Sequence, residues 1–331
     1  MSDPDPVLES HYKLVFEELF DGAVVPVLGA GVNLCGPPEA EDWFAGSKHL
    51  PSGGELAAHL AKKFRFPDEA DAHDLVRVSQ YAEAMTGWGR LYDTLHEIFV
   101  GEYRPTPLHV FLARLPKRIA AETGSPRYQL IVTTNYDDAL EAAFRDEGEE
   151  FDVITYIAEG ENRGRFMHHK PDGGQQVIAR ANEYIELPVD ERGRPERTMI
   201  LKIHGAVDRT KPTWENDSYV ITEDDYIEYL TRSDISSLVP PALVAKLKRS
   251  QLLFLGYSMR DWNLRVILHR IWGEQKLSGT FAAWAIQLKP DPIEKKFWEQ
   301  RGVDVFDVSL SDYVAALEEL AREAQGAVVG R

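Results

Sequence analysis

Four short polar motifs follow apolar segments of the sequence, and their residue types could bind a nucleotide and move a proton. Glycines let backbone N–H groups approach a diphosphate closely. An imidazole titrates near neutral pH and can act as a general base, while amide and carboxylate groups can position a water molecule or stabilise developing positive charge. The motifs are Gly29-Ala30-Gly31-Val32-Asn33, Thr133-Thr134-Asn135-Tyr136-Asp137, His204-Gly205 and Gly256-Tyr257-Ser258.

Each motif alone also has a plain structural explanation. A Gly-x-Gly turn often serves only strand–helix packing, and Gly31 is not followed by the regular GxGxxG spacing. His204 could be held by backbone at a strand end. Asn135 could cap the following helix, and Asp137 could occupy its first turn. The occurrence of all four motifs after apolar segments is what favours a functional site.

Buried strands alternating with helices are predicted along the chain, and these elements must position the motifs. The alternation predicts an α/β fold with a Rossmann-like parallel sheet flanked by helices. In such sheets ligands bind beyond the carboxyl ends of the strands. Apolar runs predict strands at 23–28, 128–133, 199–203, 252–255, 281–287 and 303–308. Helical periodicity predicts helices at 7–20, within 55–118, and at 137–146, 219–230, 241–250, 261–272, 292–301 and 311–324.

The segment from about 151 to 197 is rich in Gly, Glu and Arg and is interpreted as an insertion of loops or short strands. Its adjacent His168 and His169 lack the spacing of metal ligands and are assigned to a loop. The acidic run 146–152 predicts a solvated face. Near the glycine turn, Trp43 is a candidate to line the ligand pocket or its lid, as are Phe44 and His49.

The amino-acid composition excludes several classes of protein. The 331 residues include 37 Lys and Arg against 54 Asp and Glu, a formal net charge of −17. This balance argues against direct nucleic-acid binding, which relies on stripes of Lys and Arg. Cys35 is the single cysteine, which excludes an intrachain disulfide and a zinc site made of this chain's thiolates. With neither an apolar run of about 20 residues nor a signal-peptide pattern, a cytoplasmic protein away from membranes is expected.

In their order along the chain, from about 23 to 308, the four motifs resemble the blocks of the Sir2 superfamily. In sirtuins these blocks bind NAD+, and the asparagine and histidine are needed to cleave its nicotinamide–ribose bond. The resemblance implies catalytic roles for Asn135 on the ribose or attacking water, for His204 as a general base, and for Asp137 beside the nicotinamide ribose. It implies cofactor binding by Gly29, Ala30, Gly31, Asn33, Thr134, Gly256, Ser258, Asp261 and Asn263.

The sequence differs from sirtuins at several positions, and these differences indicate which group of the superfamily it resembles more. Protein-deacylating sirtuins carry a four-cysteine zinc ribbon, which a chain with one cysteine cannot build. Thr134 stands where sirtuins have glutamine, and Asn33 where they usually have serine. The chain is more similar to the bacterial Sir2-like group of anti-phage defence, which hydrolyses NAD+. The blocks at 219–226 and 256–263 also resemble that group. This implies an NAD+ hydrolase that uses NAD+ as substrate and needs no metal.

The resemblance also implies how the chain is organised and with what it works. Residues 1–22 are expected to form an N-terminal helix and candidate assembly element, and 311–331 a C-terminal helix. Between them, 23–310 is the expected Sir2-like domain, with a helical insertion at about 55–120 and a loop-rich insertion at about 151–198. The length leaves no room for a separate sensor domain of about 100 residues.

A homo-oligomer is therefore expected, together with a HerA-type hexameric ATPase or, as second choice, an Argonaute-like protein. Two other functions stay open: a zinc-independent protein deacylase or ADP-ribosyltransferase, and a nucleotide sensor without turnover.

Overall fold

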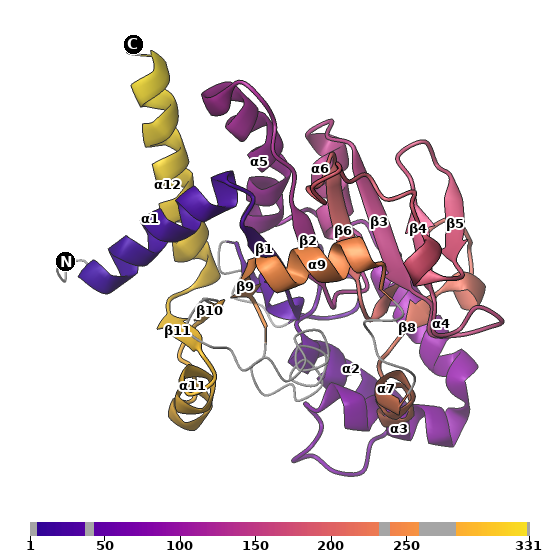
Figure 1. Cartoon of the computed structure of the whole chain (residues 1–331). Coiled ribbons are helices and arrows are strands. Elements are labelled where there is room, and N and C mark those ends of the chain that lie inside the picture. Colours follow the sequence, from indigo (N-terminus) through magenta and orange to yellow (C-terminus); the bar gives the residue numbers. More distant parts are fainter. Residues whose placement is uncertain (1–4, 37–42, 232–238, 258–282, 330–331) are drawn as a thin grey trace.

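A computed structural model describes residues 5–36, 43–231, 239–257 and 283–329 of the chain. In this part, nine strands form one sheet in the order β11-β10-β9-β1-β2-β6-β3-β4-β5, and helices cover both of its faces (Figure 1). The strands are β1 (Val24–Leu28), β2 (Leu130–Thr133), β3 (Phe151–Tyr156), β4 (Phe166–His169), β5 (Gln175–Ile178), β6 (Thr198–Lys202), β9 (Gln251–Leu255), β10 (Ala283–Gln287) and β11 (Val303–Asp307).

Seven of these strands, from β11 to β3, run parallel, whereas β4 and β5 pair antiparallel at one edge. The predicted α/β fold with a Rossmann-like parallel sheet is confirmed. The chain passes from β1 to β2 on one side and later builds β9, β10 and β11 on the other. The carboxyl ends of β1 and β9 therefore flank the switch point of the topology, which is where open α/β sheets bind ligands.

The central strand β1 shows why its sequence is apolar without interruption. Val25 and Val27 belong to one core, whereas Val24 and Leu28 belong to the core on the opposite face. A strand that is buried on both faces needs apolar residues at every position. The first core is covered by α9 (Pro241–Arg249), α11 (Pro292–Glu299) and part of α7 (Glu223–Thr231), the second by α1 (Pro6–Phe20), α5 (Pro107–Thr123), α6 (Ala139–Asp146) and α12 (Leu310–Val329).

A separate helical unit stands between β1 and β2 in the chain. It consists of α2 (Gly53–Phe64), α3 (Leu75–Thr86) and α4 (Trp88–Phe99), which share a third apolar core. A capping box starts α2, because Ser52 Oγ accepts from Glu55 N and the Glu55 carboxylate accepts from Ser52 N at 2.8 Å. The segment predicted as one helical insertion thus has two parts, since α5 returns to the sheet.

The segment at about 151–198, interpreted from the sequence as an insertion of loops or short strands, contains three short strands in its first part, and these strands, β3, β4 and β5, extend the main sheet. His168 lies on β4 and not in a loop. Asp152, assigned above to a solvated face, is fully buried on β3 and bonds His168 Nε2 at 2.8 Å. The Arg197 guanidinium binds the other carboxylate oxygen at 2.9 Å. Because Asp152 and His168 are polar residues at buried positions, β3 and β4 lack the regular alternation of apolar and polar residues that would indicate a strand.

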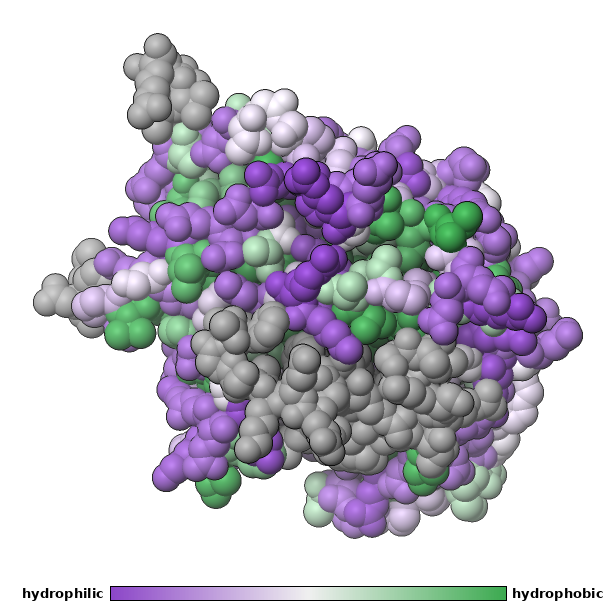
Figure 2. Space-filling view, viewed as in Figure 1, coloured by the Kyte–Doolittle hydropathy of each residue, from purple (hydrophilic) through white to green (hydrophobic). Residues whose placement is uncertain are grey.

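Two further predicted helices need comment, because one begins later than predicted and the other lies outside the described residues. The helix predicted from 219 begins at Glu223, because Ser218–Tyr219 (β8) pairs with Gly205–Ala206 (β7) in a small second sheet. The helix predicted at 261–272 lies outside the described residues. No helix in the described ranges is long and apolar enough to cross a membrane. The surface facing the viewer is mostly hydrophilic, with scattered apolar patches (Figure 2).

Candidate functional site

The turns that follow β1 and β9 pack directly against each other at the switch point. Gly29 N donates to the Leu255 carbonyl at 3.0 Å, and Gly31 N donates to the Gly256 carbonyl at 2.7 Å. A Cβ atom on Gly31 would lie 2.6 Å from the Gly256 oxygen, and Gly256 itself has a φ of +64°. The contact between the two turns requires these glycines. It also engages two of the N–H groups that the resemblance had placed against the phosphates, while Ala30 opens a short 3-10 helix, η1 (Ala30–Leu34).

The segment after β2 lies over the glycine turn and holds Asn135. Thr134 N donates to the Leu28 carbonyl at 3.1 Å. The Asn135 side-chain amide donates to the Gly29 carbonyl at 3.3 Å, and its backbone N–H donates to Thr133 Oγ1 at 3.0 Å. Asn135 is 8% exposed. The hydrogen bond to Gly29 thus orients the Asn135 amide at the carboxyl ends of the strands, where open parallel sheets bind their ligands.

The histidine motif is joined to the asparagine motif through one backbone unit, Val220. The Val220 N–H donates to the His204 carbonyl at 2.9 Å, and Tyr136 Oη donates to the Val220 carbonyl at 2.8 Å. His204 is buried, and its Nδ1 lies 3.5 Å from the hydroxyl of Tyr226 on α7. The two rings meet edge to face. The imidazole is therefore fixed in place by α7 and by the strand end that carries it.

Asp137 is turned toward the protein interior. Its carboxylate is buried and accepts from Ala139 N at 3.0 Å at the start of α6. Burial raises the pKa of Asp137 to about 6, and the nearby positive charge of Lys202 limits that rise. The negative charge of Asp137 in turn helps burial to raise the pKa of Tyr103. The Asp137 carboxylate thus helps to start α6.

Asn33 connects the glycine turn to the helical unit. Its Nδ2 donates to the Pro51 carbonyl at 3.0 Å, immediately before α2. Its Oδ1 is buried and has no hydrogen-bond partner among the described residues. An orphaned buried acceptor is rare in folded proteins and suits a donor from water or ligand.

The structure thus brings most of the predicted residues together. Gly29, Ala30, Gly31, Thr134, Asn135 and Gly256 meet at the carboxyl ends of β1, β2 and β9, and His204 joins them through Val220. Asp137 faces inward and Asn33 faces Pro51. Ser258, Asp261 and Asn263 lie outside the described residues.

Sequence reasoning missed Glu141 and Lys202, and it included Tyr226 only as part of the block 219–226, without a role in the site. A lysine at the end of an apolar strand is a signal that could have been used, because a buried lysine needs a partner.

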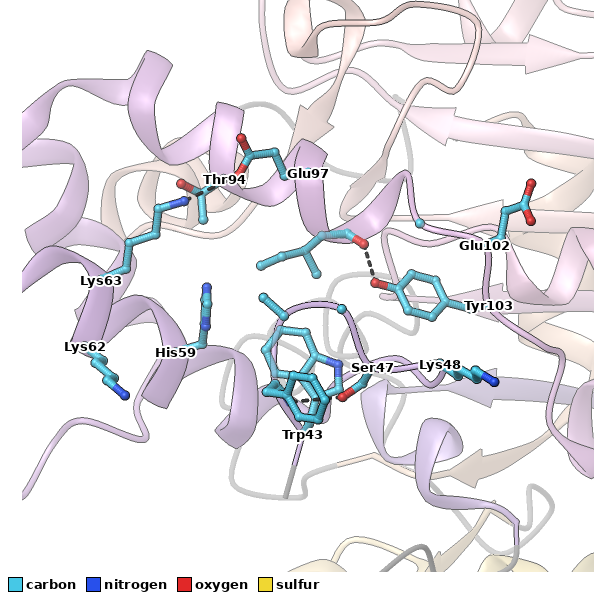
Figure 3. Close-up of a pocket in the computed structure, with 15 residues that line it drawn as sticks. Trp43, Ser47, Lys48, His59, Lys62, Lys63, Thr94, Glu97, Glu102 and Tyr103 are labelled. Carbon is cyan, nitrogen blue, oxygen red and sulfur yellow. Dashed lines mark hydrogen bonds and ion pairs between the residues drawn. The ribbon is translucent and has the colours of Figure 1, made fainter. Parts of the chain in front are cut away.

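A cavity of about 880 Å³ lies between α2, α4 and the loops at 43–48 and 101–103 (Figure 3). Trp43, Phe44 and Tyr103 contribute aromatic surface, and Lys63 pairs with Glu97 at 3.5 Å on its rim. Tyr103 Oη donates to the Ile98 carbonyl at 2.5 Å. Trp43 and Phe44, which were predicted as pocket-lining candidates, line this cavity, whereas none of the predicted catalytic or cofactor-binding residues does.

Comparison with known proteins agrees with this architecture. Residues 129–306, more than half of the chain, match the family model described as a SIR2-like domain. The chain belongs to the SIR2-like domain family. The resemblance inferred from the four motifs is thereby confirmed.

Two kinds of curated relatives match parts of the chain. Over 182 residues it is 23% identical to "Defense-associated sirtuin 2" of Bacillus subtilis, covering 54% of this chain and 14% of that protein. Over 200 residues it is 28% identical to "NAD(+) hydrolase ThsA" of Acinetobacter baumannii (strain 532279), covering 60% and 31%. The ThsA of Cytobacillus dafuensis is 26% identical over 199 residues, covering 60% and 30%. The matches therefore span less than a third of the length of these relatives.

Proposed function

We propose that this protein is a cytoplasmic NAD+ glycohydrolase that cleaves the nicotinamide–ribose bond to nicotinamide and ADP-ribose in bacterial anti-phage defence. The observation that carries the proposal is that Tyr136 and Val220 link the Asn135 motif to the His204 motif at the carboxyl ends of the parallel strands. The SIR2-like family match and the relatives named NAD(+) hydrolase and defence-associated sirtuin support it.

Hydrolysis of the nicotinamide–ribose bond requires few catalytic groups from the protein. When nicotinamide leaves, the pyridinium nitrogen takes the electrons of the broken bond, and positive charge develops on the ribose in an oxocarbenium-like state. Asn135 orients the ribose or the attacking water, and fixed backbone dipoles at the strand ends stabilise the charge. Water then forms the new bond to C1′ and gives its proton to His204. Without an acyl acceptor in the site, water is the available nucleophile.

The test follows nicotinamide release by chromatography from purified protein and NAD+ in H₂¹⁸O, with and without an acetyl-lysine peptide. Hydrolysis predicts release without peptide and one ¹⁸O atom in each ADP-ribose. Release that requires the peptide would replace the proposal by a deacylase, and transfer of label-free ADP-ribose to protein would indicate an ADP-ribosyltransferase. Bound NAD+ without release, in the presence and absence of a partner, would leave a nucleotide sensor.

We also propose that the activity is gated by assembly, because an ungated NAD+ hydrolase would deplete the cell that makes it. The expected assembly is a homo-oligomer working with a HerA-type hexameric ATPase or, as second choice, an Argonaute-like protein. The inner face of α1 already packs on α12, where His11 Nε2 meets Tyr313 Oη at 2.9 Å. Its outer face exposes Val7 and Leu14, at 67% and 43%. Light scattering that finds only monomers at micromolar concentration, for wild type and Leu14→Ser alike, would contradict self-assembly through α1.

A further inference from the structure

A buried ion pair lies directly beneath the candidate site. Lys202 ends β6 and is 1% exposed, and its Nζ stands 2.8 Å from Glu141 Oε1 on α6. The same Nζ donates to the backbone carbonyl of Asp137. Lysine and glutamate are rarely buried this fully, and the desolvation of both charges can outweigh their attraction. Stability alone is therefore a weak reason for placing this pair here.

The position of Lys202 in the sheet connects both halves of the site. In the parallel register, Lys202 pairs with Thr133 at the end of β2 and with Thr155 on β3. It stands beside the residue that opens the asparagine motif and two positions before His204. The turn from Thr134 to Asp137 is thus held at both ends. Asn135 bonds the glycine turn on one side, and the Asp137 carbonyl bonds Lys202 on the other.

Among the charges around this turn, Lys202 is a buried cation that contacts the turn directly at the Asp137 carbonyl. His109 on α5 is buried, and burial together with the Lys202 charge lowers its pKa to about 4, so it stays neutral. The acids facing Lys202 are Glu141 and Asp137, while Asp138 is paired outward with Arg209 and Arg145, each at 2.7 Å. Burial, with the Asp137 charge as a smaller cause, raises the pKa of Tyr103 on the loop after α4.

We propose that Lys202 is a positioning residue, which with Glu141 fixes the turn from Thr134 to Asp137 and so sets the Asn135 amide relative to His204. The catalytic part of this inference rests on the proposed NAD+ hydrolysis, whereas its structural part concerns the turn alone. Lys202 touches no substrate in this scheme. It acts through the backbone carbonyl that it binds and through the charge that it places beneath the turn.

The decisive variant removes both charges together. Lys202→Met alone strands a buried carboxylate and would destabilise any protein, so it cannot separate positioning from folding. Lys202→Met with Glu141→Leu replaces the pair by apolar side chains of similar size, which commonly leaves stability unchanged or improved. Lys248→Met, an exposed change on α9, controls for the substitution type.

For the double variant we expect a urea unfolding midpoint near that of wild type, a kcat for nicotinamide release lowered about 10- to 100-fold, and a KM for NAD+ changed less than about threefold. Amide hydrogen exchange should rise in residues 134–138 and stay unchanged in β1. The proposal is overturned if the double variant recovers both stability and kcat, or if exchange at 134–138 does not rise.

A wild-type protein that releases no nicotinamide would defeat the proposed function instead, and the exchange measurement would still decide whether Lys202 holds the turn.

Discussion

Replacing Gly31 by alanine tests whether the contact between the β1 and β9 turns organises the candidate site. A Cβ atom at this position would lie 2.6 Å from the Gly256 oxygen and 2.8 Å from the Gly256 Cα. Both neighbours are backbone atoms of a turn held at a φ of +64°, so no side chain can swing away to relieve the clash. The two turns must separate, and their direct hydrogen bond of 2.7 Å must lengthen.

The magnitude follows from these distances. Ordinary contact begins at 3.4 Å, so the turns must move apart by about 0.8 Å. Overpacking of this kind typically costs about 1–3 kcal/mol. A lost buried hydrogen bond adds about 1 kcal/mol. We therefore expect Gly31→Ala to lower the free energy of unfolding by about 2–4 kcal/mol and, because the Asn135 amide is bound to this turn, to reduce nicotinamide release as well.

Urea unfolding followed by circular dichroism measures the effect, with the slope checked for constancy. Gly36→Ala is the matched control, because a Cβ there would meet nothing within 4 Å and its φ is not positive. The control should stay within about 0.5 kcal/mol of wild type, as substitutions that disturb no packing or hydrogen bond usually do. A Gly31→Ala protein as stable as this control would refute the reasoning that close packing of the turns requires glycine.

Two other predictions concern buried polar groups away from the site. Asp152→Asn should lower the free energy of unfolding by about 3 kcal/mol, because it removes the fully buried carboxylate that pairs with both His168 and Arg197. Asp146→Asn, an exposed change in the same acidic run, should alter the free energy of unfolding little, and equal effects of the two changes in urea titrations would contradict this reasoning. Burial lowers the pKa of His11 to about 4, so between pH 6.5 and 4 the unfolded chain binds a proton that the folded chain refuses. Stability should fall on acidification through this window by up to about 3 kcal/mol for this group, and His11→Phe should flatten that dependence; an unchanged slope would disprove the assignment.

The sheet could be predicted from the sequence wherever a strand is buried on both faces. The runs that form β1 and β9 are apolar at nearly every position, and no competing signal obscures them. The strands β3 and β4, which lie toward one edge of the sheet, could not be predicted in the same way. Their buried Asp152 and His168 satisfy each other across the sheet, a pairing between distant residues that local hydrophobic periodicity cannot register.

The candidate site was predictable in its motifs but not in its connections. Polar residues after successive parallel strands must gather at one edge, which follows from topology. The connections depend on contacts between segments far apart in the chain. Gly31 packs on Gly256, and Val220 joins Tyr136 to His204. The start of α7 at Glu223 has the same origin, since Tyr219 is taken into a strand pair with Gly205.

The central claim is that Asn135 acts in cleavage of NAD+, and it is tested most directly by separating binding from turnover in two asparagine variants. Asn135→Ala removes the amide at the strand ends, whereas Asn182→Ala changes an exposed residue of η2 (Ala181–Glu183). NAD+ binding is measured by calorimetry and nicotinamide release by chromatography on the same samples. The account predicts that both variants bind NAD+, that Asn182→Ala retains wild-type release, and that Asn135→Ala releases none. Full release by a folded Asn135→Ala protein would contradict it.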